Sequence, residues 1–441
     1  MRLKLLALGV AIVTAAPAAV TSAQAENGNF VPLFTYRTGP FSGSGIPVAD
    51  GLHDYFTMLN ERDGGIGGEK IIVQECEDGY DTQKGVQCYD SVKDRNPVVI
   101  TPYSTGITEQ LIPKAAVDKI PILSMSYGLS ASADGQEFPW IFNPPDTYWD
   151  GASAFIRHVA DVEGGFAKLK GKTIGLIYLD APYGKEPIPL LQSLAKDYGY
   201  TIKLYPVEAS QMQNQDSVWL DIRRDRPDRL YLQGWGAMNP TAVEDAAKNN
   251  FRMDHLVGVW WSGGDQDARP AGAGGKGYTT LDINGVGDEL PGDPGHSQIR
   301  GRQGQKPDTE RRSRAESLQP RGHERALIAQ GIRNAQKLTG KKLIDGAAMR
   351  RGLEALNVTE ARWKEIGLPG FAEPIHLSCT DHNGHDNVFL VQWDGTKWTE
   401  EPGSIAPIHD KVQPLIDGAA QQYVKANAGW PKRSEACERS S

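Results

Sequence analysis

Two series of short apolar runs, separated by helix-length amphipathic segments, limit the chain to one class of fold. The first series predicts alternating strands and helices at residues 30–36, 47–62, 71–76, 82–93, 97–101, 108–118 and 120–125. The second begins with a helix and alternates in the same way, at residues 151–162, 173–179, 187–198, 201–206, 218–225, 229–233, 241–249 and 256–261. Strands that alternate with helices pair in parallel. We therefore expect an α/β fold with two Rossmann-like units, each a buried parallel sheet covered by helices.

The C-terminal part of the chain follows a different pattern. It predicts three helices, at residues 326–338, 345–356 and 412–426. Two strands, 375–380 and 387–393, are expected to form a hairpin around Asn383-Gly384, a dipeptide typical of hairpin turns. A second turn at Asp394-Gly395 precedes Lys397-Trp398.

The first 25 residues have the features of a secretory signal peptide. Arg2 and Lys4 form a short basic start, residues 5–20 are mostly apolar, and Ala23-Gln24-Ala25 offers a small-x-small cleavage site. The alternative of a membrane anchor is disfavoured, because the apolar run is shorter than the roughly 20 residues that span a bilayer. We therefore expect cleavage after Ala25 and a periplasmic protein that begins at Glu26.

The charge balance argues against nucleic-acid binding. The chain of 441 residues carries 47 Lys and Arg against 55 Asp and Glu, a net charge of −8. Removal of Arg2 and Lys4 with the signal leaves 45 − 55 = −10. A phosphate backbone requires a concentrated positive field, so general nucleic-acid binding is not expected. The 39% hydrophobic share is sufficient for two or three folded domains.

Four cysteines in an exported chain indicate disulfide bonds. An even number in an oxidising compartment favours two disulfides over free thiols, and three pairings are possible. We favour Cys76–Cys88, since it closes a short loop between a predicted strand and a predicted helix. Cys379–Cys437 would then tie the C-terminal tail to the body.

The segment 291–325 does not fit the surrounding pattern. Seven of its 35 residues are Arg, and only Ile299, Ala315 and Leu318 are hydrophobic, which is typical of disorder or a basic linker. Back-translation with a shift of one nucleotide offers a second explanation. Residues 292–305 can then encode V-I-Q-D-I-R-K-Y-V-V-D-K-G-K, an amphipathic helix, and 318–324 can encode Y-N-R-G-V-M-S. We therefore hypothesise two compensating frameshifts, with a genuine disordered insert as the alternative.

Motifs of catalysis are scarce. The chain has no G-x-S-x-G, Walker or H-E-x-x-H motif. The glycine-rich residues 272–277 lack the strand-to-helix context of a nucleotide loop and are better explained as a flexible crossing segment. Asp381, His382, His385 and Asp386 have metal-ligating side chains, but a solvated hairpin tip explains them better. Asn357 begins a weak glycosylation pattern. We expect no enzyme, metal or cofactor.

Polar and aromatic residues gather in the loops that follow the predicted strands. In the first unit these loops, 36–45, 103–106 and 124–128, supply hydroxyl and backbone N–H groups just before helices. Such groups suit a carboxylate or another small polar group. In the second unit the loops carry the aromatic side chains of Tyr183, Trp235 and Trp260-Trp261, which can cover a ligand. Any one of them can equally be a turn or packing residue, so the prediction depends on their recurrence at strand ends.

Four segments together resemble the branched-chain amino acid type of ABC-transporter substrate-binding protein. They are 35–40 (TYRTGP), 60–66 (NERDGGI), 102–106 (PYSTG) and 119–124 (KIPILS). The resemblance covers nearly the whole mature chain except 291–325, and the shifted-frame peptide also looks like what the family carries there. It implies the type I periplasmic-binding-protein fold, and a small solute that is captured by hinge closure and delivered to an ABC permease in the inner membrane.

The resemblance also implies two lobes joined by three crossings, which we place near Trp149, Gly275 and Glu373. The expected limits are 26–148 plus 276–373 for the first lobe, 149–275 plus 374–430 for the second, and 431–441 for a tail. The protein is expected to be a monomer. An exported receptor subunit that presents its solute to a membrane sensor is the alternative.

The same resemblance assigns roles to residues at the strand ends. Ser104 and Thr105 match the residues that hold the α-carboxylate of the ligand, and Tyr183 matches an aromatic that closes from the second lobe. The full set of expected ligand-binding residues is Tyr36, Tyr103, Ser104, Thr105, Ser124, Ser126, Tyr127, Tyr183, Trp235 and Trp261.

One loop departs from the family pattern. Amino-acid binders of this family usually place an acidic residue after the strand equivalent to 229–233, where it pairs with the ligand's ammonium group. Residues 234–240 (GWGAMNP) contain no acid. A buried ammonium without a partner is costly, so a standard α-amino acid is disfavoured unless Asp180 or Asp265 serves instead. A neutral, carboxylate-bearing or aromatic solute is at least as well supported.

Overall fold

The computed structural model describes residues 28–285, 322–366, 368–384 and 386–437. The expected signal peptide and residues 286–321, which include most of the anomalous segment, lie outside the described residues. Within the described part of the chain, no helix combines the length and the apolar character that crossing a membrane requires.

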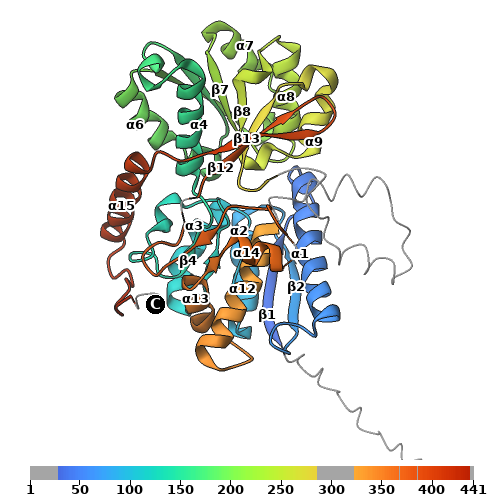
Figure 1. Ribbon diagram of the computed structural model, residues 1–441, viewed down its shortest axis with the longest axis vertical. Coiled ribbons are helices and arrows are strands. Elements are labelled where there is room, and N and C mark those ends of the chain that lie inside the picture. The colour runs from blue at the N-terminus through green and yellow to red at the C-terminus, as the bar shows by residue number, and fades with distance from the viewer. Residues whose placement is uncertain (1–27, 286–321, 367, 385, 438–441) are drawn as a thin grey trace, which may run out of the picture.

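The first lobe is built on short parallel strands (Figure 1, lower half). β1 (Asn29–Thr35) pairs with β2 (Ile71–Glu77), and β3 (Ile122–Leu123) pairs with β4 (Ile141–Phe142). The predicted strand 97–101 lies between these pairs but forms only isolated parallel bridges, to Phe30 and Leu33 on one side and to Ile122 on the other. The helices that pack around these strands are α1 (Ser42–Arg62), α2 (Thr82–Val92), α3 (Thr105–Asp118), α12 (Gly322–Thr339) and α13 (Gly346–Glu354).

The second lobe contains a seven-stranded sheet in the order β13-β12-β9-β8-β7-β5-β6 (Figure 1, upper half). Its parallel strands are β5 (Thr173–Leu179), β6 (Thr201–Val207), β7 (Arg229–Gln233), β8 (Leu256–Gly258) and β9 (Thr279–Asp282). The helices of this lobe are α4 (Tyr148–Glu163), α5 (Pro182–Lys185), α6 (Ile188–Tyr198), α7 (Asp216–Asp225), α8 (Met238–Lys248) and α9 (Asp265–Ala268). Residues 279–282 were expected in the first lobe. They are instead a central strand of this sheet, because β9 pairs with both β8 and β12.

The predicted hairpin around Asn383-Gly384 is wrong. β11 (Ile375–His376) pairs with β10 (Asn357–Val358), next to α14 (Glu360–Glu365), and not with the strand that follows it. β12 (Val388–Trp393) forms its hairpin with β13 (Trp398–Ile405) instead, across the Asp394-Gly395 turn. The Asp394 carboxylate accepts hydrogen bonds from the N–H groups of Thr396 and Lys397, which stabilises this turn.

The last helix, α15 (His409–Ala426), contacts both lobes and lies beside them in Figure 1. Its first half packs on the second lobe, where Lys411 pairs with Asp197 at 2.9 Å. Its second half leaves that lobe, and Tyr423 packs against Phe138 of the first lobe with ring centroids 5.0 Å apart. Residues 374–430 were expected in the second lobe. The helix instead links the two lobes, in addition to the expected crossings.

Both expected disulfides are present. Cys76 at the end of β2 bonds Cys88 in α2, and Cys379 bonds Cys437 in the C-terminal tail. The tail is also held by the Trp430 indole, which donates a hydrogen bond of 2.6 Å to the Glu137 carbonyl, and by an ion pair between Arg433 and Glu354. The end of the described chain is thus fixed to the first lobe.

Candidate functional site

A pocket lies where loops of the two lobes meet, beyond the carboxyl ends of the strands. The cavity that remains among its side chains has a volume of about 20 Å³. It is lined by Tyr36, Tyr80, Tyr103, Ser104, Thr105, Tyr127, Tyr148, Tyr183, Trp235 and Trp261. Parallel sheets gather their loops at this edge, and this is where ligands of open α/β sheets bind.

The polar side of the pocket is the N-terminus of α3. Ser104 is the N-cap residue, and its hydroxyl accepts a hydrogen bond from the Ile107 N–H at 3.3 Å. Thr105 begins the helix, and its hydroxyl accepts a hydrogen bond from the Gly128 N–H at 3.2 Å. The N-terminus of a helix of this length carries partial positive charge, so this side of the pocket favours a negative or electron-rich group.

Tyr103 and Tyr127 are fixed against each other beside this helix. Tyr103 adopts a left-handed backbone conformation, with φ of 50°, and its N–H donates to the Tyr127 hydroxyl at 2.8 Å. That hydroxyl in turn lies 3.3 Å from the Leu123 carbonyl, to which it donates. With its hydroxyl engaged by the backbone, Tyr127 presents its ring to the pocket.

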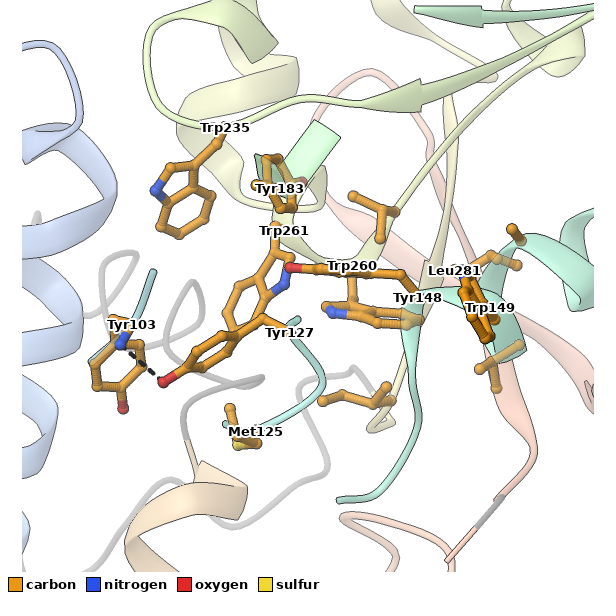
Figure 2. Packing of buried hydrophobic residues seen from close by; sticks show 14 of the residues in the cluster. Tyr103, Met125, Tyr127, Tyr148, Trp149, Tyr183, Trp235, Trp260, Trp261 and Leu281 are labelled. Atoms are coloured by element: carbon orange, nitrogen blue, oxygen red, sulfur yellow. Dashed lines mark hydrogen bonds between the residues drawn. The ribbon is translucent and has the colours of Figure 1, made fainter. Parts of the chain in front are cut away.

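The second lobe contributes aromatic walls. The Tyr183 hydroxyl donates to the Gly234 carbonyl at 2.8 Å, which fixes α5 to the loop after β7. In that loop Trp235 lies edge-to-face with Trp261, with ring centroids 5.4 Å apart, and Trp261 lies 6.4 Å from Tyr127. Figure 2 shows Trp235, Trp261, Tyr127 and Tyr103 around one space.

Eight of the ten expected binding residues line the pocket, but Ser124 and Ser126 do not. The Ser124 hydroxyl is buried against that of Thr108, at 3.3 Å. The Ser126 hydroxyl donates to the Pro144 carbonyl, and its own carbonyl accepts from the Trp260 indole at 3.1 Å. Both serines thus hold the loop 124–128 in place.

Tyr80 and Tyr148 line the pocket without having been expected there. Tyr80 follows β2, so it occupies the same kind of strand-end position that identified the other loops. Its ring lies 5.1 Å from that of Tyr36. Tyr148 begins α4 and precedes Trp149, near which only a crossing between the lobes was expected. Its ring stacks on that of Trp260, with ring centroids 5.7 Å apart. The expectation that binding residues follow strands could have identified Tyr80, whereas the sequence carries no comparable signal for Tyr148.

No charged side chain lines the pocket, and the two alternative acids lie outside it. Asp180 pairs with Lys185 and Asp265 pairs with Arg269. Three other carboxyl groups are buried behind the walls, those of Asp78, Glu186 and Asp267. Burial raises the pKa of Asp78 and of Glu186 to about 7.

The two lobes touch on more than one side of the pocket. The Ser130 hydroxyl of the first lobe donates to the Glu186 carboxyl of the second at 2.6 Å. The Ala237 N–H donates to the Pro40 carbonyl at 3.2 Å, and the rings of Tyr36 and Trp235 lie 6.3 Å apart. The pocket therefore takes its walls from both lobes, which are in contact around it.

The candidate metal ligands belong to a turn, but the expected solvated hairpin tip is wrong, because His382 is fully buried and the flanking strands do not pair with each other. The Asp381 carboxylate accepts hydrogen bonds from the N–H groups of Asn383 and Gly384, and His382 stacks on Phe142. His385 lies outside the described residues. Among the residues that the structure describes, no three His, Cys, Asp or Glu side chains are grouped so that they could hold a metal ion.

The described fold is similar to solved structures of binding proteins. A structure from the Pseudomonas fluorescens group, named an ABC transporter permease, is 34% identical with a TM-score of 0.81, and the match covers 92% of this chain and 99% of that one. A branched-chain amino acid ABC transporter from Thermus thermophilus with bound valine is 19% identical with a TM-score of 0.72, over 88% and 99%. A solute-binding protein from R. palustris in complex with benzoate is 16% identical with a TM-score of 0.65, over 86% and 97%.

A family model gives the same result from the sequence. The model described as periplasmic binding protein matches residues 30–397. No curated protein sequence matches the chain significantly. The family and the similar structures are solute-binding proteins and not enzymes. The chain therefore belongs to the periplasmic binding protein family, with the type I fold of the Leu/Ile/Val-binding ABC-transporter substrate-binding proteins.

Proposed function

We propose that this protein captures a small solute outside the cytoplasm and delivers it to the permease of an ABC importer. The observation that carries the proposal is the pocket whose lining residues come from both lobes. In this arrangement closure of the lobes surrounds the solute, and opening releases it. The sequence features of a secretory signal in residues 1–25 support a periplasmic location.

The polar end of the solute is expected at the N-terminus of α3. The hydroxyls of Ser104 and Thr105 and the first backbone N–H groups of the helix offer hydrogen bonds to a carboxylate or a hydroxyl. The rest of the solute meets aromatic rings. Because no carboxylate lines the pocket, a primary ammonium group would be buried without an ionic partner. A standard α-amino acid is therefore a poor candidate, although a similar structure contains valine.

A thermal-shift screen of amino acids, amides, aromatic acids and quaternary ammonium compounds tests the proposal. At least one small solute is expected to raise the melting temperature, since a ligand that binds only the folded state stabilises it. Equal or greater stabilisation by branched-chain amino acids would contradict the argument from the missing acid. Failure of every solute, confirmed by calorimetry, would contradict the proposed function.

Ser104→Ala combined with Thr105→Val is expected to abolish binding of the solute that the screen identifies. The change removes both hydroxyls from the polar end of the pocket but leaves its shape almost unchanged. We expect at least a hundredfold loss of affinity, about 3 kcal/mol, by calorimetry. The matched control is Ser193→Ala with Thr201→Val, outside the pocket in the second lobe. Unchanged affinity in the first variant would remove these residues from the site.

A further inference from the structure

Resting on the proposed function, we propose that the solute carries a quaternary ammonium group, which the aromatic rings of the pocket hold through cation–π contacts. The class includes compounds such as choline and glycine betaine. The proposal depends on two observations about the pocket: the side chains that line it and the charges behind them.

Aromatic side chains make up nearly the whole wall. Eight of the ten lining residues are Tyr or Trp, the other two are Ser104 and Thr105, and no aliphatic side chain is among them. A branched aliphatic solute requires no such composition. The electron-rich faces of several aromatic rings around one space are, by contrast, what attracts a cation that cannot form hydrogen bonds. Trp235 and Trp261 come from the second lobe and Tyr103 and Tyr127 from the first, so closure completes the enclosure (Figure 2).

The absence of a carboxylate from the pocket lining also fits a quaternary ammonium solute. A primary ammonium group has three N–H donors that need acceptors once water is removed. A trimethylammonium group has none, so it loses no hydrogen bonds on entering an aromatic pocket. The hydroxyls of Tyr127 and Tyr183 are already engaged with the backbone, which leaves their rings to contact the solute.

Burial raises the pKa of Asp78 and of Glu186 to about 7, so these carboxyl groups behind the rings add negative potential chiefly above that pH. Asp78 lies behind Tyr80, whose N–H donates to its carboxylate at 2.7 Å, and it acts electrostatically on Tyr127. Glu186 and Asp267 act in the same way on Tyr148 and Tyr183. None of the lining residues is cationic. At any pH where some of these groups are ionised, the potential in the pocket is more favourable to a cation than to a neutral solute.

The pocket has two unlike sides, the N-terminus of α3 and the aromatic rings. A trimethylammonium group with a short polar arm would place its cationic end among the rings. The arm would then reach the N-terminus of α3, with a hydroxyl in choline or a carboxylate in glycine betaine.

Two pairs of isosteres test the inference on the intact mature protein. Choline is compared with 3,3-dimethylbutanol, and glycine betaine with 3,3-dimethylbutanoate, by calorimetry at low and moderate salt. Within each pair the shape is the same and only the positive charge differs. We expect the cation to bind at least about tenfold more tightly than its neutral-centred partner in one pair.

Two outcomes would overturn the inference, and they differ in what they say of the proposed function. Equal or tighter binding of the tert-butyl compounds, or binding only of aromatic or aliphatic acids, would exclude the quaternary ammonium class and leave solute binding established. If neither these compounds nor any in the wider screen bound, both proposals would fail.

Substitution of the indoles provides a second readout. Trp235→Phe keeps an aromatic wall with a weaker cation–π surface, and Trp235→Leu removes it. The ratio of cation to isostere affinity is expected to fall stepwise from wild type to Phe to Leu. Trp398→Phe in β13, outside the pocket, is the control. Circular dichroism and melting temperature verify folding, and an unchanged ratio in a folded Trp235→Leu variant would contradict the role of this ring.

Discussion

Arg229 is a nearly buried cation at the start of β7, and the Glu163 carboxylate is its ionic partner. Its guanidinium donates to the Glu163 carboxylate at 2.7 Å, and Lys172 pairs with the same carboxylate at 2.7 Å. These two cations lower the pKa of Glu163 to about 2. Because the folded state favours the ionised carboxylate, its contribution to stability is present above about pH 4.5 and is lost as the pH falls toward 2.

Glu163→Gln is therefore expected to destabilise the protein near neutral pH and much less in acid. The substitution leaves the Arg229 guanidinium without its ionic partner, so we expect a loss of about 2 kcal/mol at pH 7. The difference from wild type should shrink as the pH falls from 4.5 toward 2. Urea unfolding at several pH values measures this, with the exposed Glu61→Gln as control. A difference that does not vary with pH would contradict the role of this carboxylate.

At the scale of elements, the start of α12 contains two residues that do not suit their surroundings. His323 is fully buried against Trp363 and Phe371, and both ring nitrogens lack a hydrogen-bond partner in the described structure. Burial lowers its pKa to about 3. The Glu324 carboxyl is also fully buried, which raises its pKa well above the ordinary value. The shifted-frame peptide replaces these residues by Met and Ser, which suit a buried apolar site and a small polar site. The frameshift hypothesis thus gains support from packing.

The double variant His323→Met with Glu324→Ser is expected to be more stable than the unsubstituted protein. Removal of two buried polar groups that are poorly compensated should raise the free energy of unfolding by about 2 kcal/mol. Urea unfolding measures the change, and His53→Met on the exposed side of α1 is the control. A less stable double variant would contradict the hypothesis, as would independent resequencing that confirms the printed reading frame.

At the scale of the whole molecule, α15 and the tail add a further connection between the two lobes. The helix starts on the second lobe and ends on the first. The disulfide Cys379–Cys437 joins residues that are 58 positions apart in the sequence. Cys76–Cys88 closes a separation of only 12 residues within the first lobe. Because the cost of closing a loop in the unfolded chain grows with its length, the tail disulfide is expected to stabilise more.

Cys379→Ser with Cys437→Ser should lower the free energy of unfolding by about 4 kcal/mol, and Cys76→Ser with Cys88→Ser by about 3 kcal/mol. Urea unfolding of both double variants gives the comparison within one protein. A larger loss for the short loop would show that loop length does not control the effect here.

The sequence determined the class of fold and most of the pocket because both follow from local patterns. Apolar runs of strand length between amphipathic helices require parallel sheets, and parallel sheets bring strand-end loops such as 103–106 and 234–236 to one edge. Eight expected residues line the pocket for that reason.

Only the tertiary structure decided features that depend on contacts across the chain. β12 pairs with β13 and β9, because hydrogen bonding within the sheet outweighs an Asn-Gly turn signal. Tyr148 joins the pocket because its ring packs against Tyr183 and Trp260. The helix α15 turns back to the first lobe because the Tyr423 ring packs against Phe138. Periodicity records which face of an element is buried, but it does not record which distant surface covers that face.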